Sequence, residues 1–148
     1  MFLDLREIRR SGKDHQDFFF QYQPESLLVD IPSVQIRYPI DIKGEITLTG
    51  LHSAYVEGEI TFCIYGECTR CLKQTECTIT AEFAEQIEAN NEDGYSLVND
   101  KVDLTKIVED AIFINMPVTL LCSEDCKGIC PDCGVNLNDE QCKCNKGR

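Results

Sequence analysis

The 148-residue chain predicts an α+β fold: a mainly antiparallel β-sheet or partial barrel, with one packed helix and a C-terminal zinc-knuckle tail. Three observations lead to this fold class. Apolar and polar residues alternate through the first half of the chain, a helical periodicity follows near 103–114, and six of the ten cysteines come after Leu121. These features predict a mainly-β domain at 1–117 and a cysteine-rich metal-binding tail at 118–148.

The strands are expected between Phe18 and about Gln86. Apolar residues recur there at every second position, which is typical of antiparallel sheets that keep one face polar. Turn residues at Gly44, Gly50 and Gly66 separate the runs. The predicted runs cover residues 18–22, 36–42, 46–48, 55–65 and 78–87.

The helix follows an acidic, solvated loop at 88–94. Asp103 is expected to cap it, because a carboxylate can accept the free N–H groups of a first helical turn. The apolar residues that follow are spaced by three and four positions, and Pro117 ends the run. We expect this amphipathic helix to lie on the sheet with its apolar side inward: Leu104, Ile107, Val108, Ala111 and Ile112.

The charge of the chain limits its function. The net charge is −12, which argues against an electrostatic clamp on nucleic acid and fits a soluble protein or one that meets a basic partner. Charges interrupt residues 1–10, so they do not resemble a signal peptide, and no apolar run approaches the roughly 18 residues of a membrane span. A cytoplasmic location is expected, where thiols stay reduced and serve as metal ligands or free thiols.

The tail carries the strongest signal for a site. A Cys-x2-Cys pair followed by Gly, as in Cys130-Pro-Asp-Cys133-Gly134, can bind one tetrahedral zinc ion through a tight turn. Zinc needs four ligands, so we expect this pair plus two of the remaining four tail cysteines to bind it. The alternative is a tail of free thiols. The six candidate ligands are Cys122, Cys126, Cys130, Cys133, Cys142 and Cys144.

A second group of cysteines falls between two predicted strands. Cys68 and Cys71 occupy the expected hairpin turn, flanked by Cys63 and Cys77. Three roles remain open for this pair besides that of buried structural thiols. It could bind metal with the two flanking cysteines, join the tail knuckle across the fold, or serve in redox chemistry. Redox pairs favour a helix N-terminus, and the context here is β.

Signatures of enzymes are missing. His15 and His52 are the two histidines, and neither has a partner at metal-ligand spacing. The sequence also contains no phosphate-binding loop, no Gly-x-Ser-x-Gly elbow and no His-Glu-x-x-His segment. An all-cysteine metal site is usually closed and structural. We therefore expect a protein without catalytic activity and without a small-molecule substrate.

The order of these motifs resembles the YceD family of large-ribosomal-RNA-accumulation proteins, in its form with a cysteine tail. The resemblance extends from Met1 to about Cys144. It rests on Cys68-Thr69-Arg70-Cys71-Leu72 after a strand, followed by Asn115-Met-Pro-Val-Thr-Leu-Leu-Cys122, then Cys126-Lys-Gly128-Ile-Cys130-Pro-Asp-Cys133-Gly134-Val-Asn136-Leu-Asn138 and Cys142-Lys-Cys144.

The resemblance implies a bacterial or organellar cytoplasmic protein with a role in 23S rRNA accumulation or processing, and hence in large-subunit biogenesis. It implies functional importance for Cys68, Arg70, Cys71 and the tail from Cys122 to Cys144, and no catalytic residue. Some relatives lack the tail. This implies that the tail metal serves stability or docking.

The resemblance implies pre-50S ribosomal components or an rRNA-processing factor as partners, and their basic surfaces would suit the acidic charge of this chain. A local RNA contact is the other option. A thiol-redox or metal-sensing protein that uses the Cys-x2-Cys pairs is the alternative function. The candidate basic patches are Arg6, Arg9, Arg10 and Lys13; Arg70 and Lys73; and Lys143, Lys146 and Arg148.

Overall fold

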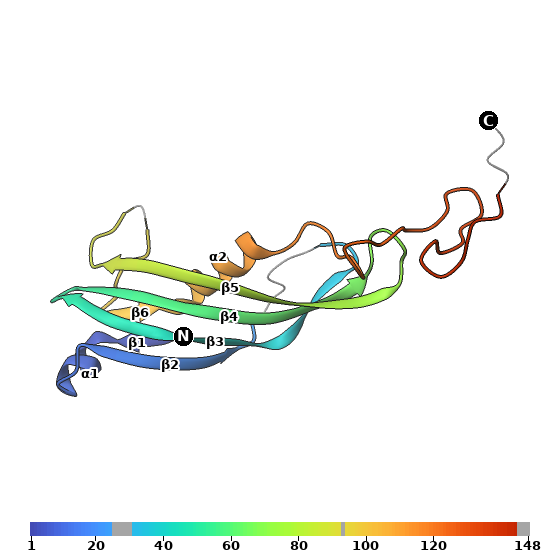
Figure 1. Ribbon diagram of the computed structural model, residues 1–148. Coiled ribbons are helices and arrows are strands. Elements are labelled where there is room, and N and C mark those ends of the chain that lie inside the picture. The colour runs from blue at the N-terminus through green and yellow to red at the C-terminus, as the bar shows by residue number, and fades with distance from the viewer. Residues whose placement is uncertain (25–30, 93, 145–148) are drawn as a thin grey trace. The chain divides into compact units, whose positions relative to one another are not determined.

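A computed structural model of the chain describes residues 1–24, 31–92 and 94–144. An open four-stranded sheet with the order β2-β3-β4-β5 forms its main part (Figure 1). This arrangement confirms the expected mainly antiparallel α+β architecture. The strands of the sheet are β2 (His15–Tyr22), β3 (Val34–Gly50), β4 (Ser53–Glu67) and β5 (Gln74–Glu88).

Four shorter elements complete the fold. Strands β1 (Phe2–Asp4) and β6 (Lys101–Asp103) pair antiparallel as a two-stranded sheet. Each leads directly into a helix, β1 into α1 (Leu5–Arg10) and β6 into α2 (Leu104–Asn115). No helix in the described part of the chain is long and apolar enough to cross a membrane.

The chain divides into two compact units. The first comprises Met1–Val29, Tyr38–Phe62 and Ile79–Met116. The second comprises Asp30–Arg37, Cys63–Thr78 and Pro117–Arg148, so it contains both the β4–β5 turn and the tail. The last segment of the second unit begins at Pro117, next to the domain boundary predicted after residue 117. The predicted separation of the tail as its own domain stays a prediction.

The core of the first unit follows the predicted alternation. Ile40, Ile42 and Ile46 on β3 are fully buried, whereas Asp41 and Lys43 between them are exposed. Val56 and Ile60 on β4 are also fully buried. The sheet therefore has one apolar and one polar face, as expected for an antiparallel sheet with one side packed.

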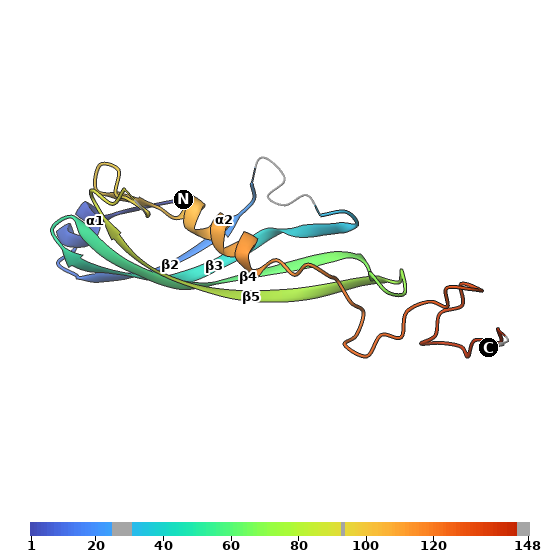
Figure 2. The same ribbon diagram turned by 90° about the horizontal axis from the view of Figure 1, so that it is seen from above.

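Helix α2 covers the apolar face and lies at the predicted place (Figure 2). Asp103 caps it by accepting the backbone N–H of Thr105 at 2.9 Å. The Tyr22 hydroxyl of β2 donates a hydrogen bond to Glu109 in the middle of the helix. All five residues of the predicted apolar side are buried: Leu104, Ile107, Val108, Ala111 and Ile112.

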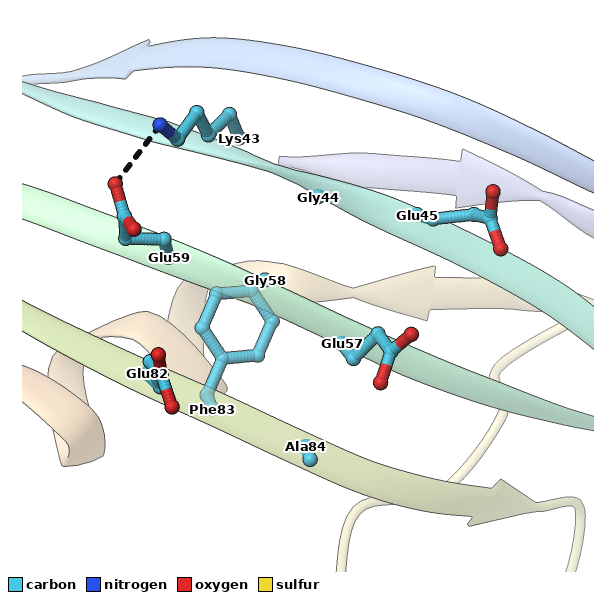
Figure 3. Close-up of a pocket in the computed structure, with 9 residues that line it drawn as sticks. All are labelled: Lys43, Gly44, Glu45, Glu57, Gly58, Glu59, Glu82, Phe83 and Ala84. Carbon is cyan, nitrogen blue, oxygen red and sulfur yellow. Dashed lines mark ion pairs between the residues drawn. The ribbon is translucent and has the colours of Figure 1, made fainter.

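Two glycines allow aromatic rings to reach the backbone of the sheet. A Cβ atom added at Gly58 would lie 2.7 Å from Cζ of Phe83 and 2.5 Å from the Lys43 carbonyl oxygen. A Cβ atom at Gly44 would lie 2.8 Å from Cζ of Phe18. Figure 3 shows the Phe83 ring against β4 at Gly58. Only glycine fits such close approaches.

Candidate metal centres

Four thiols from two distant parts of the chain meet in what we name the hairpin cluster, which consists of Cys68, Cys71, Cys122 and Cys126. Their sulfur atoms all lie within 4.8 Å of one another. The Sγ–Sγ distance is 3.8 Å for Cys68 and Cys126 and 3.5 Å for Cys71 and Cys122. Cys68, Cys71 and Cys126 are buried and Cys122 is half-buried, so the cluster is enclosed by protein.

A tight turn between β4 and β5 positions the first pair of these thiols. The N–H of Leu72 donates to the Cys68 carbonyl at 2.9 Å, and the N–H of Cys68 donates to the Lys73 carbonyl at 2.9 Å. Leu72 follows the second cysteine of the turn and has a left-handed φ of 62°. These contacts fold the Cys-x2-Cys segment back on itself, so that both sulfurs face the same side.

Backbone contacts hold the tail against this turn. The N–H of Thr69 donates to the Leu120 carbonyl at 2.9 Å, just before Cys122. The Arg70 guanidinium donates from Nη1 to the Cys126 carbonyl at 3.0 Å. Arg70, which the sequence singled out, therefore contacts the backbone of a cluster cysteine and leaves the sulfur atoms free.

The remaining four tail cysteines form the tail cluster, which consists of Cys130, Cys133, Cys142 and Cys144. Their sulfur atoms also lie within 4.8 Å of one another. The Sγ–Sγ distance is 3.2 Å for Cys130 and Cys142 and 3.7 Å for Cys133 and Cys142. Cys133 is exposed, and Cys142 and Cys144 are half-buried. Solvent therefore reaches this cluster more easily than the hairpin cluster.

The turn at the start of the tail cluster has the same pattern of hydrogen bonds as the hairpin turn. The N–H of Gly134 donates to the Cys130 carbonyl at 2.9 Å, and the N–H of Cys130 donates to the Val135 carbonyl at 2.8 Å. Gly134 has a φ of 73°, in the left-handed region that favours glycine.

Backbone N–H groups in both turns point at the sulfur of the first cysteine. They lower the pKa of the Cys130 thiol to about 6. Burial raises the pKa of the Cys68 thiol, but the N–H groups of Cys71 and Arg70 act more strongly together and bring it to about 6. Each cluster thus contains a thiol that ionises near neutral pH, and the thiolate is the form that binds metal.

The sulfur separations suit a tetrahedral zinc ion. Zn–S bonds of about 2.3 Å in a tetrahedron place the sulfurs about 3.8 Å apart. Sγ–Sγ distances in the tail cluster include 3.2 Å for Cys130 and Cys142 and 4.0 Å for Cys130 and Cys144, and in both clusters all of them stay within 4.8 Å. Four thiolates fill the coordination sphere of zinc, which is typical of structural sites and leaves no position for substrate.

The structure thus separates the six predicted tail ligands into two groups. The tail cluster places Cys142 and Cys144 beside the expected pair Cys130 and Cys133. Cys122 and Cys126 instead meet the hairpin pair. Cys63 and Cys77, the flanking candidates, lie outside both clusters, the first half-buried and the second exposed. That zinc occupies either cluster stays a prediction.

Sequence reasoning missed the role of Asn138. Its side-chain Nδ2 donates to Cys126 Sγ at 3.3 Å, and its Oδ1 accepts the N–H of Lys127 at 2.8 Å. In the sequence, Asn136 and Asn138 stood out only as part of the motif between Cys133 and Cys142. Nothing in that motif indicates that Asn138 reaches a cysteine of the other cluster.

Some residues of the candidate basic patches make contacts with other residues of the chain. Arg6 forms an ion pair with Asp4 at 3.0 Å, and Arg9 donates to the Leu51 carbonyl. These two arginines stabilise the ends of α1 and of the β3–β4 turn. Lys146 and Arg148 lie outside the described residues.

A shallow hollow of about 580 Å³ lies on the first unit, along β3, β4 and β5. Glu45, Glu57 and Glu82 line it together with an ion pair between Lys43 and Glu59, whose Nζ–Oε1 distance is 2.9 Å (Figure 3). These carboxylates are exposed or half-buried on an open sheet face.

Comparison with known proteins identifies the family. The family model described as "Large ribosomal RNA subunit accumulation protein YceD" matches residues 56–148. An uncharacterized protein of Mycobacterium tuberculosis is 30% identical over 110 residues, which cover 68% of this chain and 52% of the relative. An uncharacterized protein of Mycobacterium leprae is 32% identical over 91 residues, covering 55% of this chain and 42% of the relative.

A plant relative carries the family's name. The "Large ribosomal RNA subunit accumulation protein YCED homolog 1, chloroplastic" of Arabidopsis thaliana is 35% identical over 46 residues, covering 31% of this chain and 14% of the relative. The chain spans about half the length of the mycobacterial relatives it matches. No solved structure matches it. The family model covers more than half of the chain, and the chain therefore belongs to the YceD family.

Proposed function

We propose that this chain is a non-catalytic, cytoplasmic factor that supports accumulation or processing of 23S rRNA, and thereby biogenesis of the large ribosomal subunit. One observation carries the proposal: the family match at residues 56–148 contains all eight cysteines of the two clusters. The part of the chain that defines the family is thus the part organised around these thiols. We propose that these thiols bind zinc and that the bound zinc stabilises the fold.

The composition of the clusters supports zinc. Thiolates are soft ligands that select Zn²⁺ and similar ions over the hard Mg²⁺ and Ca²⁺. Four thiols that converge in reduced form without metal would be a poor core, because thiolates in close contact repel one another. A bound divalent ion removes that cost and adds folding free energy.

The arrangement of the hairpin pair speaks against the redox alternative. A dithiol redox centre needs two exposed or accessible thiols that exchange between disulfide and dithiol. Cys68 and Cys71 are buried, with 0% and 6% of their surfaces exposed, and each faces a tail cysteine. This environment favours permanent coordination.

Charge supports a basic protein partner over direct RNA contact. The first unit contains eighteen acidic and seven basic side chains, and the second contains eight and seven. Neither unit has the excess of lysine and arginine that binding of RNA phosphates needs. Pre-50S components with basic surfaces, or an rRNA-processing factor, are therefore the partners we propose.

The test uses cells that lack the gene. We expect lower levels of mature 23S rRNA and more of its precursors, measured by primer extension and gradient sedimentation. The wild-type gene and Cys77→Ser should restore the rRNA, because Cys77 lies outside both clusters. Cys68→Ser should not. Unchanged 23S precursors in the deletion strain, together with no association of the purified protein with pre-50S particles, would contradict the proposal.

A further inference from the structure

A segment of three residues joins the two clusters. Cys126 is the last cysteine of the hairpin cluster and Cys130 the first of the tail cluster. Within the segment, the N–H of Ile129 donates to the Arg70 carbonyl in the hairpin turn at 3.2 Å. The carbonyl of Gly128 accepts the N–H of Leu137, in the tail loop, at 2.9 Å. The segment is therefore bonded to the surroundings of both clusters.

Asn138 makes a direct connection between them. It lies in the loop between Cys133 and Cys142, both members of the tail cluster. Its side-chain amide nevertheless donates to the Cys126 sulfur of the hairpin cluster, at an Nδ2–Sγ distance of 3.3 Å. Its Oδ1 atom accepts the N–H of Lys127, which fixes the orientation of the amide. One cluster thus supplies a hydrogen-bond donor to a candidate ligand of the other.

A further pair of contacts fixes the position of Asn138 in the loop. The backbone N–H and the Nδ2 atom of Asn138 both donate to Oδ1 of Asn136, at 3.0 and 2.9 Å. Asn136 in turn pairs with Ile129 as an isolated β-bridge. The amide is therefore held in place by the loop itself and by the segment between the clusters.

We propose that the two clusters are separate sites for a soft divalent cation, that their occupancies are coupled, and that Asn138 is the positioning residue that couples them. The inference rests on metal binding as proposed above. Metal in the tail cluster fixes both ends of the loop, at Cys133 and Cys142, and thereby holds the Asn138 amide against Cys126. Donation of an N–H to a thiolate stabilises its charged form, so the hairpin cluster binds its ion more tightly. The coupling is reciprocal.

The experiment loads the reduced full-length protein with ¹¹³Cd²⁺, which binds thiolates as zinc does. Each filled site gives its own cadmium resonance, and competition with a chelator yields an affinity for each site. Four proteins form a cycle: wild type, Cys130→Ser/Cys133→Ser, Asn138→Ala and the combination. Gln141→Ala is the matched control, because it removes an exposed amide from the same loop.

We expect disabling the tail cluster to lower the cadmium affinity of the hairpin cluster by about tenfold or more, the usual effect of losing an outer-shell partner. Asn138→Ala should produce a similar loss while the tail cluster stays filled. The combined variant should lose no more than either alone, and Gln141→Ala should bind as wild type does. If Asn138→Ala abolishes the tail resonance, Asn138→Asp takes its place, because Asp keeps the acceptor for Lys127 and loses the donor.

Two results would overturn the inference. A hairpin-cluster affinity that is unchanged when the tail cluster is disabled shows that the sites are independent. A loss that persists at full size in the Asn138→Ala background shows that another contact carries the coupling. Because these measurements follow only metal, two uncoupled cadmium ions per chain would end this inference and leave the proposed role in rRNA accumulation standing.

Discussion

Leu72 and Gly134 occupy the same position in two Cys-x2-Cys turns, and both have a left-handed backbone, with φ angles of 62° and 73°. Each donates its N–H to the carbonyl of the first cysteine of its turn at 2.9 Å. Glycine adopts this conformation without steric cost, but a leucine Cβ meets the neighbouring carbonyl. The hairpin turn therefore holds its knuckle conformation with a strained residue where the tail turn has an unstrained one.

Relief of this strain gives the first prediction. Leu72→Gly should raise the free energy of unfolding of the metal-loaded protein by about 1 kcal/mol, because the side chain is 57% exposed and contributes little packing. Chemical denaturation measures the change. Leu51→Gly is the control, since Leu51 is also exposed in a turn but has no left-handed backbone; it should gain nothing. Equal losses in both variants would show that the Leu72 conformation carries no strain.

Metal stoichiometry gives the second prediction. Elemental analysis of reduced protein should find two zinc ions per chain, one for each cluster of four thiols. Cys71→Ser and Cys133→Ser should each retain about one ion, because three thiolates hold zinc poorly. Cys77→Ser should retain two. Two zinc ions per chain in Cys71→Ser would contradict zinc binding by the hairpin cluster.

The cap of α2 gives a prediction about pH. Burial raises the pKa of Asp103, but the hydroxyl and N–H of Thr105 lower it more strongly, to a value below 3.8. A carboxylate with a lowered pKa stabilises the fold above its ordinary value, and this contribution disappears as the pH falls through the lowered pKa. The contribution of Asp103 should thus be complete above the ordinary pKa of an aspartate, about 3.9, and be lost progressively as the pH falls below it.

The variant Asp103→Asn isolates this effect, because Asn keeps a capping oxygen and loses the charge. It should be less stable than the wild type at pH 6, by no more than about 1 kcal/mol for a partly exposed group, and the difference should shrink as the solution is acidified. Denaturation of both proteins in a chelator removes the effect of metal release. A difference that stays constant with pH would mean that the charge has no role in the cap.

The contact between Gly58 and Phe83 gives a prediction about the sheet. Gly58→Ala forces a methyl group to within 2.7 Å of the ring and 2.5 Å of a backbone carbonyl, so it should destabilise the protein by about 1–3 kcal/mol. Adding Phe83→Leu should recover part of the loss. Ala84→Ser, at an exposed position on the neighbouring strand, should change stability little. An unfolding free energy of Gly58→Ala equal to that of the wild type would show that the sheet accommodates the methyl group without loss of stability.

The strands of the main sheet and helix α2 could be predicted because the spacing of their apolar residues along the sequence indicates which side packs. The isoleucines at 40, 42 and 46 share one face of β3 since side chains alternate along a strand. The turns predicted at Gly44 and Gly66 are wrong, because these glycines lie inside β3 and β4, where strand pairing continues through them. The helix at 104–115 follows from its apolar spacing and from Asp103. In contrast, β1 and β6 are only three residues each and pair across about 100 positions, which no local pattern indicates.

The partition of the cysteines could not be predicted for a different reason. Cys122 and Cys126 lie closer in sequence to Cys130 than to the hairpin, and their spacing suits either metal site. Their assignment depends on the contact of Thr69 with the Leu120 carbonyl, which aligns the tail with the turn. Such a tertiary hydrogen bond between backbone atoms has no signature in residue type.

The two halves of the hairpin cluster are far apart along the chain, with 58 positions between Cys68 and Cys126. During synthesis the turn between β4 and β5 leaves the ribosome before Cys122 and Cys126 do. Its two thiols therefore have no partner cysteines while the rest of the first unit is translated. If the cluster binds a metal ion as proposed, it can do so with all four thiols only after Cys126 has emerged, so metal capture follows synthesis of all four strands of the main sheet. A nascent chain cut short before Cys122 keeps an open pair of thiols, and such a product can be told from the finished protein by its readiness to react with alkylating agents.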